Sequence, residues 1–396
     1  MKLLFLIADG MGDWPVKELD GLTPLEAAPT PHMDRLARSC VAGLIRTVPL
    51  GMAPGSDVAN MSLVGFDPAL HHTGRGPIEA AAQGLTLDPD DLVWRLNLVR
   101  ATSPDESGTM LDYSSGHITT EQSTPLIEDL QAHLGDDDFK FIPGIQYRHL
   151  LVHKGGANEP EAGLAIRPPH DITDQPMGPD IAAYATSARM KALFDAAAKR
   201  LAQPDNTSRA NAIWPWGQGR PLILPDFTRT YGLKAAVISA VDLVKGLGRA
   251  SGMEVIDIPG ATGLLDTNYQ GKVDAALDFL NNGGDYVYLH VEAPDECGHS
   301  GIVADKVKAI AQFDEHIVGP LTRALEGQDA AFVITCDHFT PLIERTHTTD
   351  PVPFLISHPS CTMHGLPTFS EANAAGTGVL IEQGHEALKY TLEVLS

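Results

Sequence analysis

The stretch Leu3-Leu4-Phe5-Leu6-Ile7-Ala8-Asp9-Gly10 decides the fold class, because an apolar run ends directly on a carboxylate and a glycine. A short apolar run bounded by turn residues predicts a strand that is buried on both faces. The same pattern returns in three further runs, at Ala235–Ala240, Tyr286–Val291 and Ala331–Thr335. These four runs predict a buried central sheet.

Helical patterns lie between the apolar runs. They cover Leu25–Ser39, where Pro29 and Pro31 interrupt the first half, and also Lys272–Leu280 and Ile302–Leu325. Strands that alternate with helices predict an α/β protein with a mostly parallel sheet sandwiched by helices.

The middle of the chain has a different composition. Residues 73–179 are rich in Asp, Gly, Pro and His, and they include strand-like pieces such as Tyr147–His153. The proline-rich stretch Asn158–Asp180 indicates a loop or linker. We therefore predict a core domain formed by residues 1–72 and 180–396, with residues 73–179 inserted as a smaller α+β domain.

The charge balance limits the possible partners. The chain has 396 residues, with 28 Lys+Arg against 51 Asp+Glu, which gives a formal net charge of −23. A surface this acidic repels phosphate backbones and anionic lipid, so we expect neither a nucleic acid nor a membrane as partner. The hydrophobic fraction of 43% argues against disorder. The sequence leaves the oligomeric state open.

The cysteines and the apolar runs indicate a cytoplasmic protein. Cys40, Cys297, Cys336 and Cys361 form no CxxC pair and are too sparse for a disulfide scaffold, which suits a reducing compartment. The run Leu3–Ala8 is too short for the apolar part of a signal peptide. No run approaches the length of a membrane span.

Acidic and imidazole side chains gather where three of the predicted strands end. Ligands bind at the carboxyl ends of the strands in open parallel sheets. The residues are Asp9 after the first run, Asp295 and His299 after the third, Asp337 and His338 after the fourth, and His347 nine residues further on. Any one of the aspartates on its own would be read as a helix cap or a turn former, so the inference depends on the whole set.

Carboxylates that lie close together raise each other's pKa, and a divalent cation removes this conflict. Carboxylate and imidazole ligands without a thiolate suit Mn²⁺, Zn²⁺ or Mg²⁺. Six or seven ligands suffice for two ions, and two ions about 3.5–4 Å apart suit phosphoryl displacement. The pattern therefore predicts a two-metal site.

Two further motifs carry groups that suit phosphate chemistry. In Pro54-Gly55-Ser56-Asp57, Ser56 opens an apolar helix, whose N–H groups favour an anion. A metal-bound serine there can act as a nucleophile, and the alternative is an ordinary helix cap. In Thr73-Gly74-Arg75-Gly76-Pro77, Arg75 is either a phosphate fork or a solvated turn residue.

The ordered set of motifs resembles the cofactor-independent (2,3-bisphosphoglycerate-independent) phosphoglycerate mutases of the archaeal type, in the alkaline phosphatase superfamily. The resemblance covers nearly the whole chain. It is carried by Asp9-Gly10-Met11-Gly12-Asp13, Pro54-Gly55-Ser56-Asp57, Thr73-Gly74-Arg75-Gly76-Pro77, Pro294-Asp295-Glu296-Cys297-Gly298-His299, Asp337-His338 and His347-Thr348-Thr349-Asp350-Pro351-Val352-Pro353.

The resemblance implies roles for these residues. Ser56 would carry the phosphoryl group between the 2- and 3-hydroxyls of phosphoglycerate, a small phosphorylated metabolite, and the inserted domain would be the cap that holds the glycerate. Two divalent ions, Mn²⁺ foremost, would be bound by two sets of residues. One set is Asp295, His299 and His347, and the other is Asp9, Asp337, His338 and the hydroxyl of Ser56. Arg75, Arg148 and Lys245 are candidate anion clamps.

One segment departs from the archaeal pattern. Within Asp112–Ile118, Tyr113 or Ser114 and His117 stand where archaeal mutases typically have two arginines, which makes His117 a further candidate for substrate binding. Together with Pro168–Ile172, Trp214–Gly219 and Ser239–Leu243, this departure resembles a bacterial subgroup that has been proposed to act as homoserine kinases. The alternatives to the mutase are therefore phosphoryl transfer from ATP to homoserine, another phosphomonoester transferase or phosphatase on this scaffold, or a non-catalytic binding protein.

Overall fold

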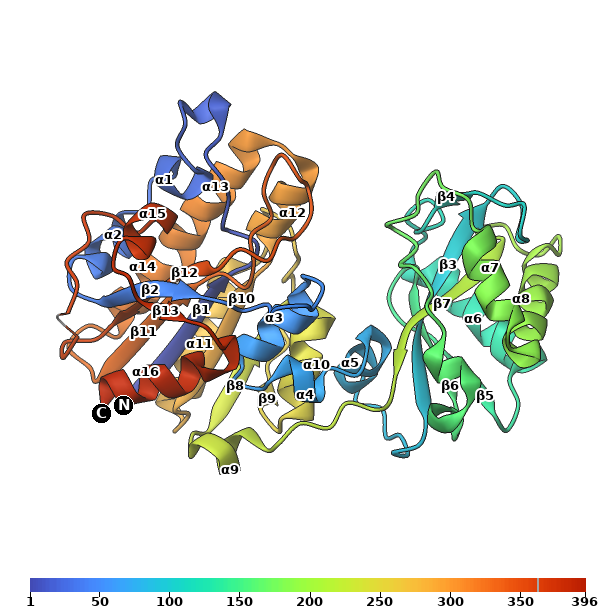
Figure 1. The fold of residues 1–396 in the computed structure, drawn as a ribbon. Coiled ribbons are helices and arrows are strands. Elements are labelled where there is room, and N and C mark those ends of the chain that lie inside the picture. Colours follow the sequence, from blue (N-terminus) through green and yellow to red (C-terminus); the bar gives the residue numbers. More distant parts are fainter. Residues whose placement is uncertain (362) are drawn as a thin grey trace. The chain divides into compact units, whose positions relative to one another are not determined.

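The computed structural model describes residues 1–361 and 363–396, which form two compact units (Figure 1). Unit 1 comprises Met1–His72 and Ile223–Ser396, and unit 2 comprises Thr73–Leu222. The inserted domain therefore extends beyond the predicted boundary at residue 179. The segment from 180 to 222 belongs to unit 2, because its apolar side chains, such as Tyr184, Phe194 and Trp214, are buried in the core of that unit.

The centre of unit 1 is an eight-stranded sheet with the order β13-β2-β12-β11-β1-β10-β8-β9. All neighbours are parallel except β12, which runs antiparallel to both β2 and β11. Its strands are β1 (Lys2–Ala8), β2 (Val41–Ile45), β8 (Ala235–Ile238), β9 (Glu254–Val255), β10 (Tyr286–Val291), β11 (Ala330–Thr335), β12 (Val352–Ser357) and β13 (Leu380–Ile381). The mostly parallel α/β fold predicted from the sequence is therefore confirmed.

The helices of unit 1 pack in two groups. One group contains α2, α11, α13, α14 and the π-helical turn η4, and the other contains α3, α10 and α16. The full set is η1 (Lys17–Leu19), α1 (Pro24–Ala27), α2 (Pro31–Ala37), α3 (Ser56–Leu63), α4 (Pro68–His71), α9 (Phe227–Tyr231), α10 (Asp242–Ala250), α11 (Tyr269–Asn281), α12 (Ala293–Ser300), α13 (Val303–Phe313), η4 (Asp314–Val318), α14 (Gly319–Ala324), α15 (Glu371–Ala375), η5 (Gly384–Glu386) and α16 (Ala387–Leu395).

One predicted helix is divided in the structure, and a second is continuous but contains a π-helical segment. The pattern over 25–39 forms α1 and α2, because Pro29 and Pro31 cannot continue a helix and Pro31 instead begins the second one. The pattern over 302–325 forms α13 and α14, which are joined by η4.

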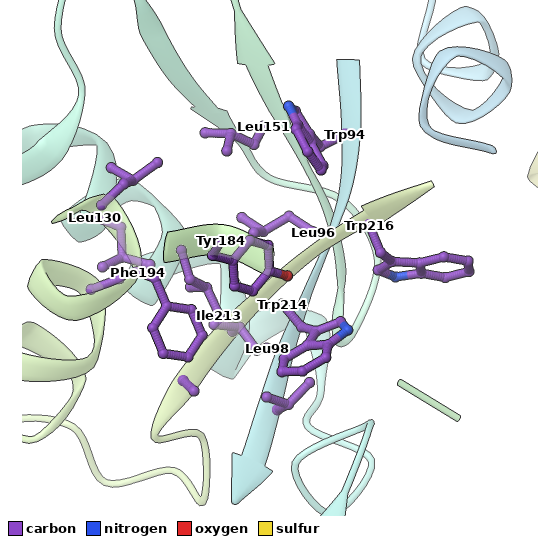
Figure 2. Close-up of a cluster of buried hydrophobic side chains, with 14 of the residues drawn as sticks. Trp94, Leu96, Leu98, Leu130, Leu151, Tyr184, Phe194, Ile213, Trp214 and Trp216 are labelled. Atoms are coloured by element: carbon purple, nitrogen blue, oxygen red, sulfur yellow. The ribbon is translucent and has the colours of Figure 1, made fainter. Parts of the chain in front are cut away.

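Unit 2 is built on a five-stranded antiparallel sheet in which β3 pairs with β4, β6 and β7. Its strands are β3 (Leu92–Ala101), β4 (Met110–Asp112), β5 (Phe139–Ile142), β6 (Arg148–His153) and β7 (Ala212–Gly219), and its helices are α5 (Arg75–Ala82), α6 (Thr120–Leu134), η2 (Gly156–Asn158), η3 (Pro160–Gly163), α7 (Gly178–Ala185) and α8 (Ala188–Leu201). Figure 2 shows its core, where Trp94, Trp214 and Tyr184 lie among aliphatic side chains of the sheet and helices.

Among the helices of the described residues, none is long and apolar enough to cross a bilayer.

Candidate functional site

The predicted ligands of unit 1 follow three neighbouring parallel strands. β1 lies between β11 and β10, so the carboxyl ends of these three strands meet at one edge of the sheet. Asp9 follows β1, and Asp337 and His338 begin two residues after β11. α12 follows β10 and carries Asp295 and His299, which lie four residues apart and therefore on one face of the helix.

Asp9, Ser56, Asp337 and His338 form the first cluster, called the Asp9 group here. The Nε2 atom of His338 is 3.0 Å from Ser56 Oγ, 3.5 Å from Asp9 Oδ1 and 3.4 Å from Asp337 Oδ2. Donor atoms that bind one ion at about 2.1 Å are separated by distances of this size. In addition, Asp9 Oδ1 is buried and accepts no hydrogen bond. The arrangement therefore fits a bound divalent cation.

Asp295, His299 and His347 form the second cluster, called the Asp295 group. His299 Nε2 is 3.1 Å from both Asp295 Oδ2 and His347 Nε2, and His347 Nε2 is 3.6 Å from Asp295 Oδ1. The other ring nitrogen of His299, Nδ1, lies 2.9 Å from the carbonyl oxygen of Arg345 and donates to it. This bond directs Nε2 toward Asp295 and His347, the orientation that a metal ligand needs. Burial lowers the pKa of His299, but the hydrogen bond and charge of Asp295 outweigh it and raise that pKa to about 9, so a bound ion would replace the proton on Nε2.

The two groups adjoin one another. The rings of His338 and His347 are 4.0 Å apart between centroids. Ligand atoms of Asp295, His338 and His347 lie within 4.8 Å of one another, as do those of Asp9, His290 and Asp337. His338 thus borders both groups. His290 is a neighbour that the sequence analysis missed, because it lies inside an apolar strand.

Burial and the neighbouring charges shift the pKa values of the clustered carboxylates and histidines. Burial, Asp337 and Asp295 raise the pKa of Asp9 well above its ordinary value. Burial also raises the pKa of Asp295, but hydrogen bonds with His299 and His347 outweigh it and hold that pKa well below the usual range. Burial lowers the pKa of His338 to about 4, so its ring is neutral at pH 7. A divalent cation would remove the repulsion between these carboxylates.

Asp337 is fixed by donors on both of its oxygens. Oδ1 accepts from the backbone N–H groups of Gly10, at 3.0 Å, and His338, at 2.9 Å. Oδ2 accepts from Asn60 Nδ2 at 2.7 Å, and Asn60 Oδ1 in turn accepts from Tyr288 Oη at 2.6 Å. Gly10 has a φ of +60°, and a Cβ there would lie 2.5 Å from Asp295 Oδ1. A glycine is therefore required between the two groups.

Ser56 is the first residue of α3, as the sequence predicted. Its carbonyl oxygen accepts from Asn60 Nδ2 at 2.9 Å, so the same amide holds both the helix and Asp337. Asn60 was missed because an asparagine inside a helix carries no motif. Its position one turn after Ser56 is the only signal in the sequence that could have indicated it.

In unit 2, the predicted cationic residues Arg75 and Arg148 lie near a third arginine, Arg95, that was not predicted. Arg75 and Arg95 lie with their guanidinium carbons 5.8 Å and 5.0 Å from the ring centre of Trp216. Arg95 donates to Glu79 at 2.7 Å, and Asn97, two residues along β3, pairs with Arg148 of β6. Burial lowers the pKa of Arg95 to about 10, and the positive charges of Arg75 and Arg148 act in the same direction. Arg95 was missed because it lies within a strand of apolar residues.

The other two predicted substrate residues lie elsewhere. Lys245 belongs to α10 of unit 1, and its Nζ is 2.7 Å from Asp257 Oδ1. His117 is an exposed residue of unit 2, and its backbone N–H donates to Ser114 Oγ at 3.0 Å.

Comparisons with known proteins agree with this geometry. A family described as the Metalloenzyme superfamily matches residues 1–388. A probable 2,3-bisphosphoglycerate-independent phosphoglycerate mutase of Geobacter sulfurreducens is 44% identical over 99% of this chain and 100% of its own length. A 2,3-bisphosphoglycerate-independent phosphoglycerate mutase of Methanothrix thermoacetophila is 43% identical over 98% of this chain and 99% of its own.

Solved structures show the same fold. A protein of Pyrococcus horikoshii has a TM-score of 0.82 and 29% identity, covering 100% of this chain and 97% of its own. A cofactor-independent phosphoglycerate mutase of Thermoplasma acidophilum has a TM-score of 0.64 and 24% identity, covering 100% of both chains. These names do not favour the homoserine kinase alternative. The chain belongs to the metalloenzyme superfamily and, within it, to the family of 2,3-bisphosphoglycerate-independent phosphoglycerate mutases.

Proposed function

We propose that this protein interconverts 3-phosphoglycerate and 2-phosphoglycerate through a phosphoserine at Ser56. The observation that carries the proposal is the position of Ser56 Oγ, 3.0 Å from His338 Nε2 at the first turn of α3. There the hydroxyl adjoins a cluster of buried metal-binding groups, and the N–H groups of the helix favour an anionic phosphoryl group. Both curated relatives named above, which are 44% and 43% identical to this chain, carry the mutase name, which supports the same activity.

The proposal includes two divalent ions, with Mn²⁺ as the first choice and Zn²⁺ or Mg²⁺ as the alternatives. Asp295, His299 and His347 would hold one ion, and Asp9, Asp337, His338 and Ser56 would hold the other. Bound there, the ions would supply positive charge that acidifies the serine hydroxyl and offsets the charge of the transferring phosphoryl group. The unpaired Asp9 Oδ1 and the bond from His299 Nδ1 to Arg345, which directs Nε2 toward Asp295 and His347, support this assignment.

The transfer consists of two displacements that balance. Ser56 Oγ forms a bond to phosphorus while the bond from phosphorus to the glycerate oxygen breaks, and the proton lost by Ser56 equals the one gained by the released hydroxyl. In the second displacement the other hydroxyl of the same glycerate forms a bond to phosphorus while the bond from Ser56 Oγ to phosphorus breaks, and the proton lost by that hydroxyl restores the one on Ser56. Within unit 1, Asn60 keeps Ser56 and Asp337 in place throughout, because it binds both.

Unit 2 is proposed to bind the acid groups of the substrate. Arg75, Arg95 and Arg148 provide the cations, and arginine forks suit carboxylate and phosphate. Lys245 and His117 remain predictions. The described cysteines are free and buried, which supports a reducing compartment and hence a cytoplasmic location.

The test is the Ser56→Ala variant. We expect loss of 2-phosphoglycerate formation from 3-phosphoglycerate with Mn²⁺ present, together with loss of ³²P labelling of the protein. The matched control is Ser62→Ala on the same helix, because Ser62 is buried and donates to the carbonyl of Thr47 instead of facing the ligand cluster. Turnover retained by Ser56→Ala, with Ser62→Ala also active, would falsify the nucleophile assignment.

A second assay separates the mutase from the kinase. Formation of phosphohomoserine from ATP and homoserine, without mutase activity in the same preparation, would replace the proposed function. Metal analysis is expected to find two divalent ions per chain, and activity with each of Mn²⁺, Zn²⁺ and Mg²⁺ would identify the preferred one.

A further inference from the structure

His290 is a fully buried histidine that the proposed mechanism does not use. It lies on β10, the strand beside β1, where it pairs with Ile7 and its neighbour Val291 pairs with Ala8. The backbone N–H of Asp9 donates to the carbonyl of Val291 at 2.9 Å. The ladder therefore holds His290 beside Asp9, and its Nε2 is 3.1 Å from Asp9 Oδ2.

The neighbours of His290 fix which ring nitrogen carries the proton. Ser239 Oγ is 3.3 Å from His290 Nδ1, and the same oxygen already accepts from the backbone N–H of Val241 at 3.0 Å. A hydroxyl can donate as well as accept, whereas the ionised carboxylate beside Nε2 only accepts, so the tautomer that suits both neighbours has Nδ1 as the acceptor from Ser239. The remaining proton of the neutral ring is then on Nε2, on the side of Asp9. A protonated Nε2 cannot bind a metal.

We propose that His290 is a positioning residue for the Asp9 group, and this inference rests on the proposed metal-binding role of Asp9. His290 Nε2 lies 3.1 Å from Asp9 Oδ2, and a hydrogen bond from Nε2–H to that oxygen would keep Oδ1 directed toward His338 Nε2, which is 3.5 Å away. In the structure as it stands, the N–H bond lies off the line to Oδ2 and makes no linear hydrogen bond. Occupation of the Asp9 group should bring the two atoms into line.

The two carboxylates of the group show why Asp9 needs such a partner. Asp337 accepts from Gly10, His338 and Asn60, so three donors fix its orientation. Asp9 Oδ1 is left without any donor, in the position that faces the group. A partner that orients the other oxygen holds the carboxylate in place before an ion binds. The side chain then loses less conformational entropy on binding. Partners of this kind change metal affinity by about 10–100-fold.

The test measures Mn²⁺ binding to the full-length protein by titration, without an activity assay. His290→Leu removes the donor, and His290→Gln keeps an N–H near the position of Nε2. We expect the first variant to bind one ion as the wild type does and the other about 10–100-fold more weakly. The second variant should recover most of this loss.

Two further variants make the result specific. Ser239→Ala frees Nδ1 to carry the proton and is expected to weaken the same ion, while leaving the Asp9 and His290 side chains unchanged. His153→Gln replaces a buried histidine of unit 2 and should leave both affinities unchanged. If His290→Leu does not fold, as urea denaturation of the metal-free protein would show, Ser239→Ala and His290→Gln still provide the comparison.

Three outcomes overturn the inference. The first is wild-type affinity for both ions in His290→Leu. The second is a wild-type protein that binds three ions and a His290→Leu variant that binds two, which would make His290 a ligand. The third is a wild-type protein that binds fewer than two ions, which would overturn the proposed metal sites as well. A wild type that binds two ions but forms no 2-phosphoglycerate refutes only the proposed activity.

Discussion

Lys306 gives the most specific prediction about what holds the ligand loops in place. Its side chain on α13 is fully buried, and Nζ donates to Asp13 Oδ2 at 2.8 Å, to the carbonyl of Thr340 at 2.8 Å and to the carbonyl of Gly12 at 3.2 Å. Gly12 and Asp13 belong to the loop that carries Asp9, and Thr340 to the loop that carries His338. One ammonium group therefore ties together the loops after β1 and β11.

The Lys306→Met substitution keeps the length of the side chain and removes the charge. Asp13 is 2% exposed at its side chain, so its carboxylate would stay buried without a counter-ion. Breaking a buried pair in this way costs about 3–5 kcal/mol, which is about two to four powers of ten in the unfolding equilibrium. We expect the urea midpoint of the metal-free protein, followed by circular dichroism, to fall accordingly.

The control lies on the same helix. Lys308 is exposed, so Lys308→Met should change stability by less than about 0.5 kcal/mol. In the double variant Asp13→Asn, Lys306→Met, the uncompensated charge is gone, and the combined loss should be smaller than the sum of the two single losses. An equal effect of Lys306→Met and Lys308→Met, or strict additivity in the double variant, would refute the reasoning.

Two other predictions concern pH and metal. Burial raises the pKa of Glu371 to about 7 from its usual 4.5, so the folded protein binds more protons than the unfolded chain between these values. The free energy of unfolding should therefore fall as pH rises from 4.5 to 7, and Glu371→Gln should reduce this slope; equal slopes in the two proteins would contradict the argument. Removing bound metal with EDTA should lower the melting temperature, since an ion present at 100 times its Kd adds about 2.7 kcal/mol. Mn²⁺ should restore it, and an unchanged melting temperature would count against both metal groups.

The strands around the site could be predicted because their sequences are apolar throughout. Strands buried on both faces need no polar face, so Leu3–Ala8 and Tyr286–Val291 are recognisable as continuous runs. The side chains that follow such runs lie at the edge of the sheet, and this is why Asp9, Asp295 and Asp337 were identified together. The supporting residues were not, because Asn60 and His290 carry no local pattern and act through contacts with distant parts of the chain.

The end of unit 2 was predicted wrongly for a related reason. β7 contains Pro215, Gly217 and Gly219, residue types that are depleted in strands, and its partner β3 lies more than a hundred residues earlier. Pro215 is tolerated because β7 pairs only with β3 and lies at the edge of its sheet. The burial of Trp214 and Tyr184 in one core, and not any turn or linker signal, keeps the segment from 180 to 222 in unit 2.

By itself, the sequence determined the α/β class, the order of the strands' polar ends and the types of ligand that they carry, because these depend on apolar runs and on the residues next to them. Only the tertiary structure decided which atoms approach within hydrogen-bonding distance. Tyr288 Oη and Asn60 Oδ1 do so although the two residues are 228 positions apart in the sequence. It also decided that Lys306, Lys272 and His290 are buried. The physical reason is that a polar side chain inside a protein is stabilised by its partners, and those partners are brought to it by the fold.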